Sequence, residues 1–143
     1  MNVCISRKHY GKRPLKPNRR AVAATEFAVC LPVIVLFVLA MIESCTMIFI
    51  KQSLTVSAYE GVRTALKDQA VAADVQQTSQ RVLTERRVNG GTVSIQPNNF
   101  ETLAPGQFIA VTVSAPADAN RVIPGNFFRG KTFSATATMM KEF

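Results

Sequence analysis

The dominant feature of the chain is the apolar stretch EFAVCLPVIVLFVLAMIESCTMIFI, residues 26–50. Glu26 opens this stretch, residues 27–42 contain no charged side chain, and Glu43 is the only charge in residues 43–50. At about 1.5 Å per residue, a helix over residues 27–50 is about 36 Å long, which is enough to cross a hydrocarbon core of about 30 Å with some tilt. The sequence therefore predicts a transmembrane helix over residues 22–50.

The net charge of +8 belongs mostly to the N-terminal tail. Seven basic residues and no acidic ones precede position 21, whereas ten basic residues face nine acidic ones in the rest of the chain. A basic flank before an apolar helix favours a cytoplasmic N-terminus and attracts membrane lipid. We therefore predict a basic cytoplasmic leader, residues 1–21. Nucleic-acid binding is disfavoured, because Pro14 and Pro17 oppose a recognition helix and no zinc-ligand spacing is present.

Two residues interrupt the apolar stretch. Pro32 removes a backbone donor and clashes with the carbonyl of Ala28, which predicts a helix kink; the alternative is a first-turn proline in a helix that begins near residue 30. Glu43 lies about 25 Å beyond Glu26 along a helix. This position suits either a solvated carboxylate at the outer interface or helix–helix pairing within an assembly.

Beyond residue 50 the apolar side chains first keep a helical spacing and then alternate. The spacing predicts an exported helical region over residues 51–90, with a second helix after a bend near Asp68 and a stop at Asn89, Gly90 and Gly91. Alternation predicts a small β-rich region over residues 91–143, with strands around Val93–Ile95, Ile109–Val113 and Phe133–Met139. Because three short strands cannot bury a core alone, we expect the exported helix to cover them. The predicted class is α+β.

Several short pieces occur in a recognisable order. RRAVAATEF runs from Arg19 to Phe27, Leu31-Pro32 follows inside the apolar helix, Ile42-Glu43 lies near its far end, and YEGVR covers Tyr59, Glu60, Gly61, Val62 and Arg63. The C-terminal strands end close to the acidic residue Glu142. With these pieces, the chain resembles the TadE/TadG-like pseudopilins of the tight-adherence, or Flp-type, pilus system.

The resemblance implies a pilin-like protein of the bacterial inner membrane whose leader a prepilin peptidase removes on the cytoplasmic face. By the family pattern the cut falls between Ala21 and Val22, although the family usually has Gly where this chain has Ala21. Glu26 and Phe27 would then set the register of packed subunits, with Glu26 pairing to the new α-amino group of Val22. The alternative for Glu26 is a carboxylate that snorkels beside Arg19 and Arg20.

The expected function is therefore that of a minor pilin-like component of a pilus or secretion assembly. Its expected partners are other pilin-like subunits and pilus assembly proteins, with the C-terminal region exported. A second reading is an uncleaved, single-pass, membrane-anchored binding module with an exported α+β domain. No enzyme is expected, since the chain has one histidine and no phosphate-binding glycine loop, and no cofactor or metal site is predicted.

Overall fold

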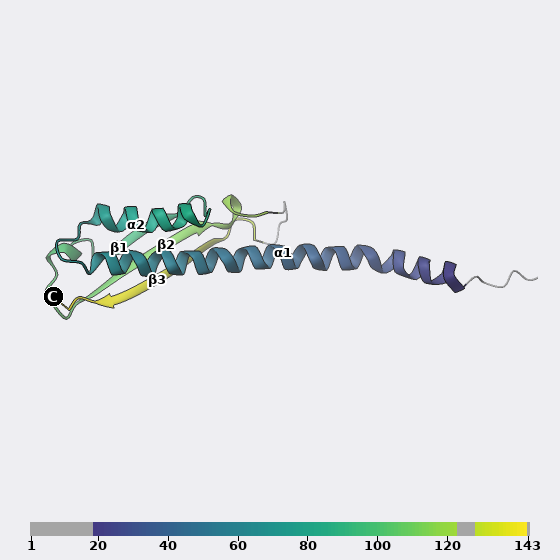
Figure 1. The fold of residues 1–143 in the computed structure, drawn as a ribbon, viewed down its shortest axis with the longest axis horizontal. Coiled ribbons are helices and arrows are strands. Elements are labelled where there is room, and N and C mark those ends of the chain that lie inside the picture. Colours follow the sequence, from purple (N-terminus) through teal and green to yellow (C-terminus); the bar gives the residue numbers. More distant parts are fainter. Residues whose placement is uncertain (1–18, 123–127, 143) are drawn as a thin grey trace, which may run out of the picture. The chain divides into compact units, whose positions relative to one another are not determined.

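The structure, a computed structural model, describes residues 19–122 and 128–142. Its elements are two helices, three strands and two short 3-10 turns (Figure 1). In chain order these are α1 (Arg19–Ala65), α2 (Ala72–Glu85), β1 (Thr92–Gln96), η1 (Phe100–Thr102), β2 (Phe108–Pro116), η2 (Ala117–Ala119) and β3 (Thr132–Met140). The predicted α+β class, with a long apolar helix, a second helix and a small antiparallel sheet, is confirmed. The predicted leader lies, up to residue 18, outside the described residues.

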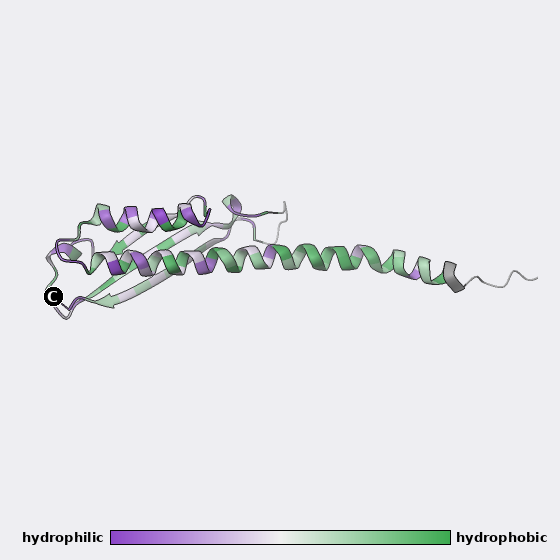
Figure 2. Cartoon of the chain, viewed as in Figure 1, coloured by the Kyte–Doolittle hydropathy of each residue, from purple (hydrophilic) through white to green (hydrophobic). Residues whose placement is uncertain are grey.

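The chain divides into two compact units, one ending at Phe37 and one beginning at Val38. In the first unit every side chain from Val22 to Phe37 is exposed, all around the helix. Most of these side chains are apolar, as the hydropathy colours of α1 show (Figure 2). A helix that is apolar on every side requires a non-aqueous environment, either lipid or other helices.

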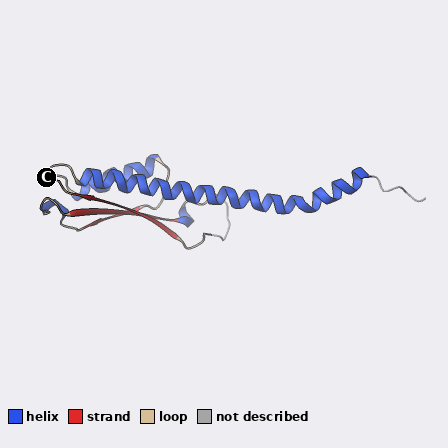
Figure 3. Ribbon diagram, turned by 90° about the horizontal axis from the view of Figure 1, so that it is seen from below, coloured by secondary structure: helices blue, strands red, loops and turns tan. Residues whose placement is uncertain are grey.

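The second unit has two layers, in which both helices lie against one face of the sheet (Figure 3). Helix α1 contributes a stripe of buried side chains at intervals of three and four residues, as the helical period requires. Helix α2 and the inner face of the sheet complete a single core. Its most deeply buried apolar members are Leu54, Ala58, Val62, Val75, Leu83, Phe100, Ile109, Val111 and Val113. Met47 and Ile50, which fall within the predicted membrane span, are also buried in this core.

The sheet has the order β1-β2-β3 with antiparallel pairing throughout. Strand β2 alternates strictly, with Ile109, Val111, Val113 and Ala115 buried and the intervening side chains more exposed. The opposite face is rich in hydroxyl groups; the Thr112 and Thr136 hydroxyls, for example, are 2.8 Å apart across β2 and β3. This alternation is what fixes the register, since a shift of one residue would turn the hydroxyls into the core.

Helices α1 and α2 approach each other closely at three small residues. The Ser57 hydroxyl donates to the carbonyl of Ser79 at 2.9 Å, and the Ser79 hydroxyl donates to the carbonyl of Ser57 at 3.3 Å. One turn later, a Cβ on Gly61 would lie far inside van der Waals contact with Ser79 Oγ and 3.1 Å from Val111 Cγ1. Gly61 is therefore the point at which α1, α2 and β2 meet.

The start of α2 agrees with the prediction, and its end does not. Helix α1 ends at Ala65 and α2 begins at Ala72, in agreement with the predicted bend near Asp68. The predicted stop at Asn89, Gly90 and Gly91 is later than the observed end of α2 at Glu85. The reason is that Arg87 already adopts a left-handed backbone, with φ 56°, so the helix ends without a glycine.

Glu43 begins the buried stripe of α1, one turn before Met47. Its side chain is only 3% exposed, and its Oε2 has no hydrogen-bond partner among the described residues. The solvated position expected for this carboxylate is therefore wrong. The helix–helix pairing that was its alternative stays a prediction. An unpartnered carboxylate in an apolar core lowers the stability of the fold.

We predict that Gly61→Ala destabilises the second unit by about 1–3 kcal/mol, because the new methyl group displaces Ser79. Without that contact the same substitution would stabilise a helix by about 0.5–1 kcal/mol, so the sign of the change is informative. Thermal unfolding of the full chain in detergent, followed by circular dichroism, measures it.

Two variants control the Gly61 prediction. Ser79→Ala removes the clashing oxygen and leaves a Cβ at an ordinary contact distance of 3.7 Å, so Gly61→Ala should cost less in that background. Arg63→Ala, on the exposed side of the same helix, should change stability little. A Gly61→Ala variant as stable as the parent chain would contradict the three-way contact.

We predict that Glu43→Leu raises the stability of the isolated protein in detergent by about 1–3 kcal/mol, because it removes a buried carboxylate that lacks a partner. Glu43→Gln should give a smaller increase. The matched control is Glu26→Leu, which replaces an exposed carboxylate of the same helix and should leave the unfolding of the second unit unchanged. A lower melting temperature for Glu43→Leu would show that the carboxylate stabilises the fold.

Candidate functional site

The candidate processing residues lie in the first turn of α1. The helix begins at Arg19, so the peptide bond between Ala21 and Val22 has helical backbone. The Thr25 hydroxyl donates to the carbonyl of Val22 at 2.7 Å, which ties this turn to the next. A peptidase that binds extended substrate would have to unwind the turn; helix ends fray at low cost, so this requirement is modest.

Glu26 and Phe27 follow one turn after the candidate cut. Both side chains are exposed, and Phe27 is 61% accessible. The ion pairs of the described side chains do not include Glu26; the side chains of Arg19 and Arg20 are outside that set. An ionised group at membrane depth costs about 2.5–3.5 kcal/mol on insertion scales, which a cationic partner offsets. Glu26 is therefore an acidic group on an apolar surface, available to a partner.

Pro32 lies inside α1, and the helix continues on both sides of it. Pro32 has no N–H, so it gives the carbonyl of Ala28 no hydrogen bond. The alternative in which the helix begins near residue 30 is wrong, because α1 begins at Arg19. The kink stays a prediction.

The YEGVR piece divides into packing and surface residues. Gly61 and Val62 are buried in the contact with α2 and β2. Tyr59 and Arg63, one turn apart, are exposed, with Tyr59 49% accessible, while Glu60 is half-buried. The ion pairs of the described residues do not include Glu60 with Arg63, although their spacing allows one. Tyr59 and Arg63 thus form an exposed aromatic and basic pair on the second unit, whereas Glu26 and Phe27 belong to the first.

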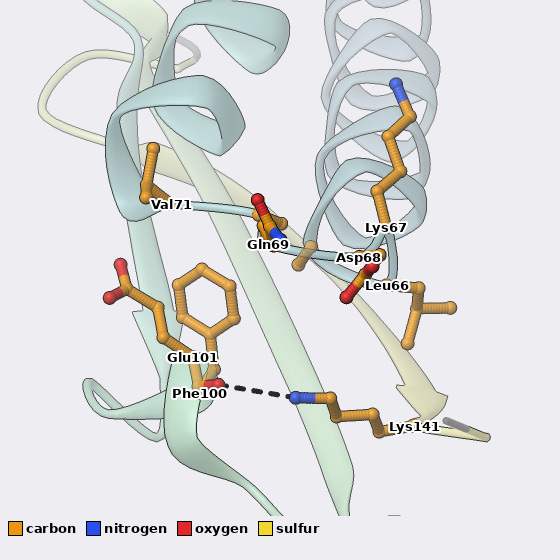
Figure 4. Close-up of a pocket in the computed structure, with 10 residues that line it drawn as sticks. Leu66, Lys67, Asp68, Gln69, Val71, Phe100, Glu101 and Lys141 are labelled. Atoms are coloured by element: carbon orange, nitrogen blue, oxygen red, sulfur yellow. Dashed lines mark hydrogen bonds between the residues drawn. The ribbon is translucent and has the colours of Figure 1, made fainter.

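A cleft of about 600 Å³ lies at the turn between α1 and α2. Figure 4 shows Phe100, Glu101 and Lys141 around it, together with Leu66, Lys67, Asp68, Gln69 and Val71. The Glu101 carboxylate accepts from the N–H of Ala72 at 2.9 Å, and the Lys141 ammonium donates to the Glu101 carbonyl at 3.4 Å. Glu101 therefore caps the N-terminus of α2, where Val71 has no side chain to do so.

Sequence reasoning missed the role of Glu101. The only local signal is that no capping side chain precedes α2. This signal does not identify the distant acid that caps the helix instead. The charged residues of this cleft are of both signs, and the hydrogen bonds of Glu101 and Lys141 hold the turn together. The arrangement is that of a structural junction.

Helix α1 is the one described helix long and apolar enough to cross a membrane. Within residues 19–122 and 128–142, no group of three His, Cys, Asp or Glu side chains is placed to hold a metal ion. Cys30 and Cys45 are exposed free thiols. The features that could bind a partner are therefore the acidic group near the start of α1, the apolar surface of α1, and the exposed side of the second unit.

Comparison with known proteins gives one match. A protein-family model described as TadE-like protein matches residues 21–63. No curated protein and no solved structure matches the chain. The matched segment contains the candidate processing residue Ala21, the pair Glu26 and Phe27, Pro32, and the YEGVR piece, and it ends before α2 and the sheet. The chain thus carries a TadE-like segment over residues 21–63, which confirms its resemblance to the TadE-like family of the tight-adherence pilus system.

Proposed function

We propose that this protein is a membrane-anchored, pseudopilin-like component of a tight-adherence-type pilus or secretion assembly. Its role is non-enzymatic and depends on the packing of α1 against other pilin-like helices. The single observation that supports this most strongly is the surface of α1 from Val22 to Phe37, which is exposed on every side and mostly apolar. The TadE-like match over residues 21–63 supports the choice of system.

The proposed membrane span covers residues 22–42. It ends there because Glu43 and Met47 belong to the core of the second unit and do not face lipid. A helix of this length extends about 31 Å, which matches a hydrocarbon core of about 30 Å. The seven basic residues before position 21 favour a cytoplasmic N-terminus in the inner membrane, so the second unit would be exported.

Removal of the leader would create a cationic partner for Glu26. A new α-amino group on Val22 lies one helical turn from Glu26 in the same chain, and the same group on a neighbouring subunit can reach Glu26 during lateral assembly. Only correct registration of two helices would bring the charges together inside the membrane. The pairing would therefore select the register at which subunits pack.

The second candidate function is an uncleaved anchored module whose second unit binds a partner and never enters a filament. Two observations favour it. Ala21 replaces the glycine usual in the family, and the Ala21–Val22 bond is helical. The exposed pair Tyr59 and Arg63 offers a surface on which such a partner could dock.

We predict that the protein purified from its native membrane begins at Val22. Intact mass spectrometry measures this directly. Ala21→Gly should increase the processed fraction because it restores the small residue usual in the family, and Ala23→Gly, two positions further on, should not. A membrane-extracted chain that retains residues 1–21 would reject processing and favour the anchored module.

We predict that Glu26→Gln lowers co-fractionation with the pilus assembly by at least about tenfold while leaving membrane insertion intact, because the loss of a charge pair in the membrane costs more than about 1.4 kcal/mol. Quantitative immunoblotting of membrane and assembly fractions measures both properties. Glu60→Gln, on the second unit, is the matched control and should co-fractionate normally. Undiminished incorporation of Glu26→Gln would remove the proposed register role.

A further inference from the structure

A groove of about 370 Å³ lies in the second unit between α1 and the beginning of β3. Its exposed lining is apolar, and its residues are Ser44, Met47, Ile48, Lys51, Phe128 and Phe133. The rings of Phe128 and Phe133 form one wall, with centroids 6.2 Å apart. We refer to this feature as the α1–β3 groove. Its lining residues come from α1, from β3 and from the segment just before β3, and none comes from α2 or β1.

The α1–β3 groove starts where the proposed span ends. Ser44 is two residues beyond Ile42 in the chain, and Ile48, which lines the groove, is 58% exposed. Phe49 beside it is 46% exposed, so apolar side chains continue outward along α1 past the span. An apolar groove at this depth adjoins the acyl chains and headgroups of the outer leaflet.

One basic side chain lines the groove, and two more are adjacent in sequence to its phenylalanines. Lys51 lines it and donates to the carbonyl of Ser134, a neutral acceptor that leaves its charge uncompensated. Arg129 and Lys131 are exposed in the segment between Phe128 and Phe133. The ion pairs of the described residues include none of these three cations.

The carboxylates at this end of the unit do not neutralise these cations. Asp118 pairs with Arg121 at 3.6 Å and accepts from the N–H of Gly130 at 2.9 Å, so it is already engaged. Glu85 pairs with Arg81 at 2.9 Å, and Glu43 is only 3% exposed. The exposed acids of the opposite end are near the α1–α2 turn, the start of α2 and the end of β3, and are Asp68, Asp74, Glu101 and Glu142.

We propose that the α1–β3 groove binds an anionic phospholipid of the membrane in which α1 is anchored. The acyl chain lies in the groove against Met47, Ile48 and the two phenylalanines, and the phosphate is bound by Lys51, Arg129 and Lys131. Lipid fits better than a protein partner because the groove continues the apolar surface of the span, and because basic residues beside a span attract anionic headgroups. This inference rests on the proposed membrane anchoring.

The bound lipid would act as a fixed contact between the second unit and the bilayer. It would restrict how the unit tilts about the end of the span, and so limit which of its faces is presented to other proteins. The basic leader provides the corresponding attraction on the cytoplasmic side.

Lipid selection by the full chain in nanodiscs tests the proposal. Cys4, Cys30 and Cys45 are replaced by Ser, and a fluorophore is attached to Thr132→Cys, an exposed position next to Lys131. Two nanodisc samples contain equal fractions of phosphatidylglycerol and phosphatidylcholine. They differ only in which of the two lipids carries a nitroxide on its acyl chain. We expect the labelled phosphatidylglycerol to quench at least about twofold more strongly, and 0.5 M salt to reduce the difference.

Matched variants separate the site from general charge. Arg129→Gln with Lys131→Gln should abolish the preference for phosphatidylglycerol. Lys67→Gln with Lys141→Gln, which removes the same charge from the opposite end, should leave it intact. Ile48→Asp should lower quenching by both labelled lipids, since it places a carboxylate in the groove. Added inorganic phosphate should not compete, because it brings no acyl chain.

Equal quenching by the two lipids in an anchored protein would overturn the lipid site alone. Protection of the fluorophore from both lipids in nanodiscs holding two copies, but not in those holding one, would assign the groove to a second copy and also overturn it. Extraction of the protein from membranes by alkaline carbonate would reject the anchoring itself, and with it the proposed function.

Discussion

The side chains of helix α1 follow two different patterns along its length, and these patterns constrain the other elements. From Val22 to Phe37 its side chains are exposed in every direction and mostly apolar, which water does not tolerate over such a length. From Lys51 onward one stripe is apolar and buried, and most of the exposed side chains are polar. The transition between these patterns determines where along α1 a membrane-spanning segment can end and a water-exposed fold can begin.

The water-exposed fold is small and relies on close contacts more than on a large core. Three short strands bury one face only, so both helices are needed to cover it. The covering is possible because Ser57 and Gly61 let α2 approach α1, and Ser79 exchanges hydrogen bonds with Ser57 there. A larger side chain at any of these positions would separate the helices and open the core.

Much of this architecture could be predicted from local patterns. The apolar run, the change from helical spacing to alternation, and the bend near Asp68 all follow from periodicity within a few residues. The burial of Glu43, the capping of α2 by Glu101 and the packing role of Gly61 could not be predicted, because each depends on contacts distant in sequence. Glu101, for example, reaches Ala72 across 29 residues. Periodicity indicates which face is buried but not which partner lies against it.

In the proposed assembly, the exposed surface of α1 packs against other pilin-like helices in the membrane. The most direct measurement is in-cell photo-crosslinking from single positions introduced one at a time along residues 27–38. We expect crosslinks to pilin-like proteins that recur about every 3.6 residues, because a packed helix presents one face to its neighbour. Crosslinks to lipid alone, with no such period, would contradict it and leave α1 as a simple anchor.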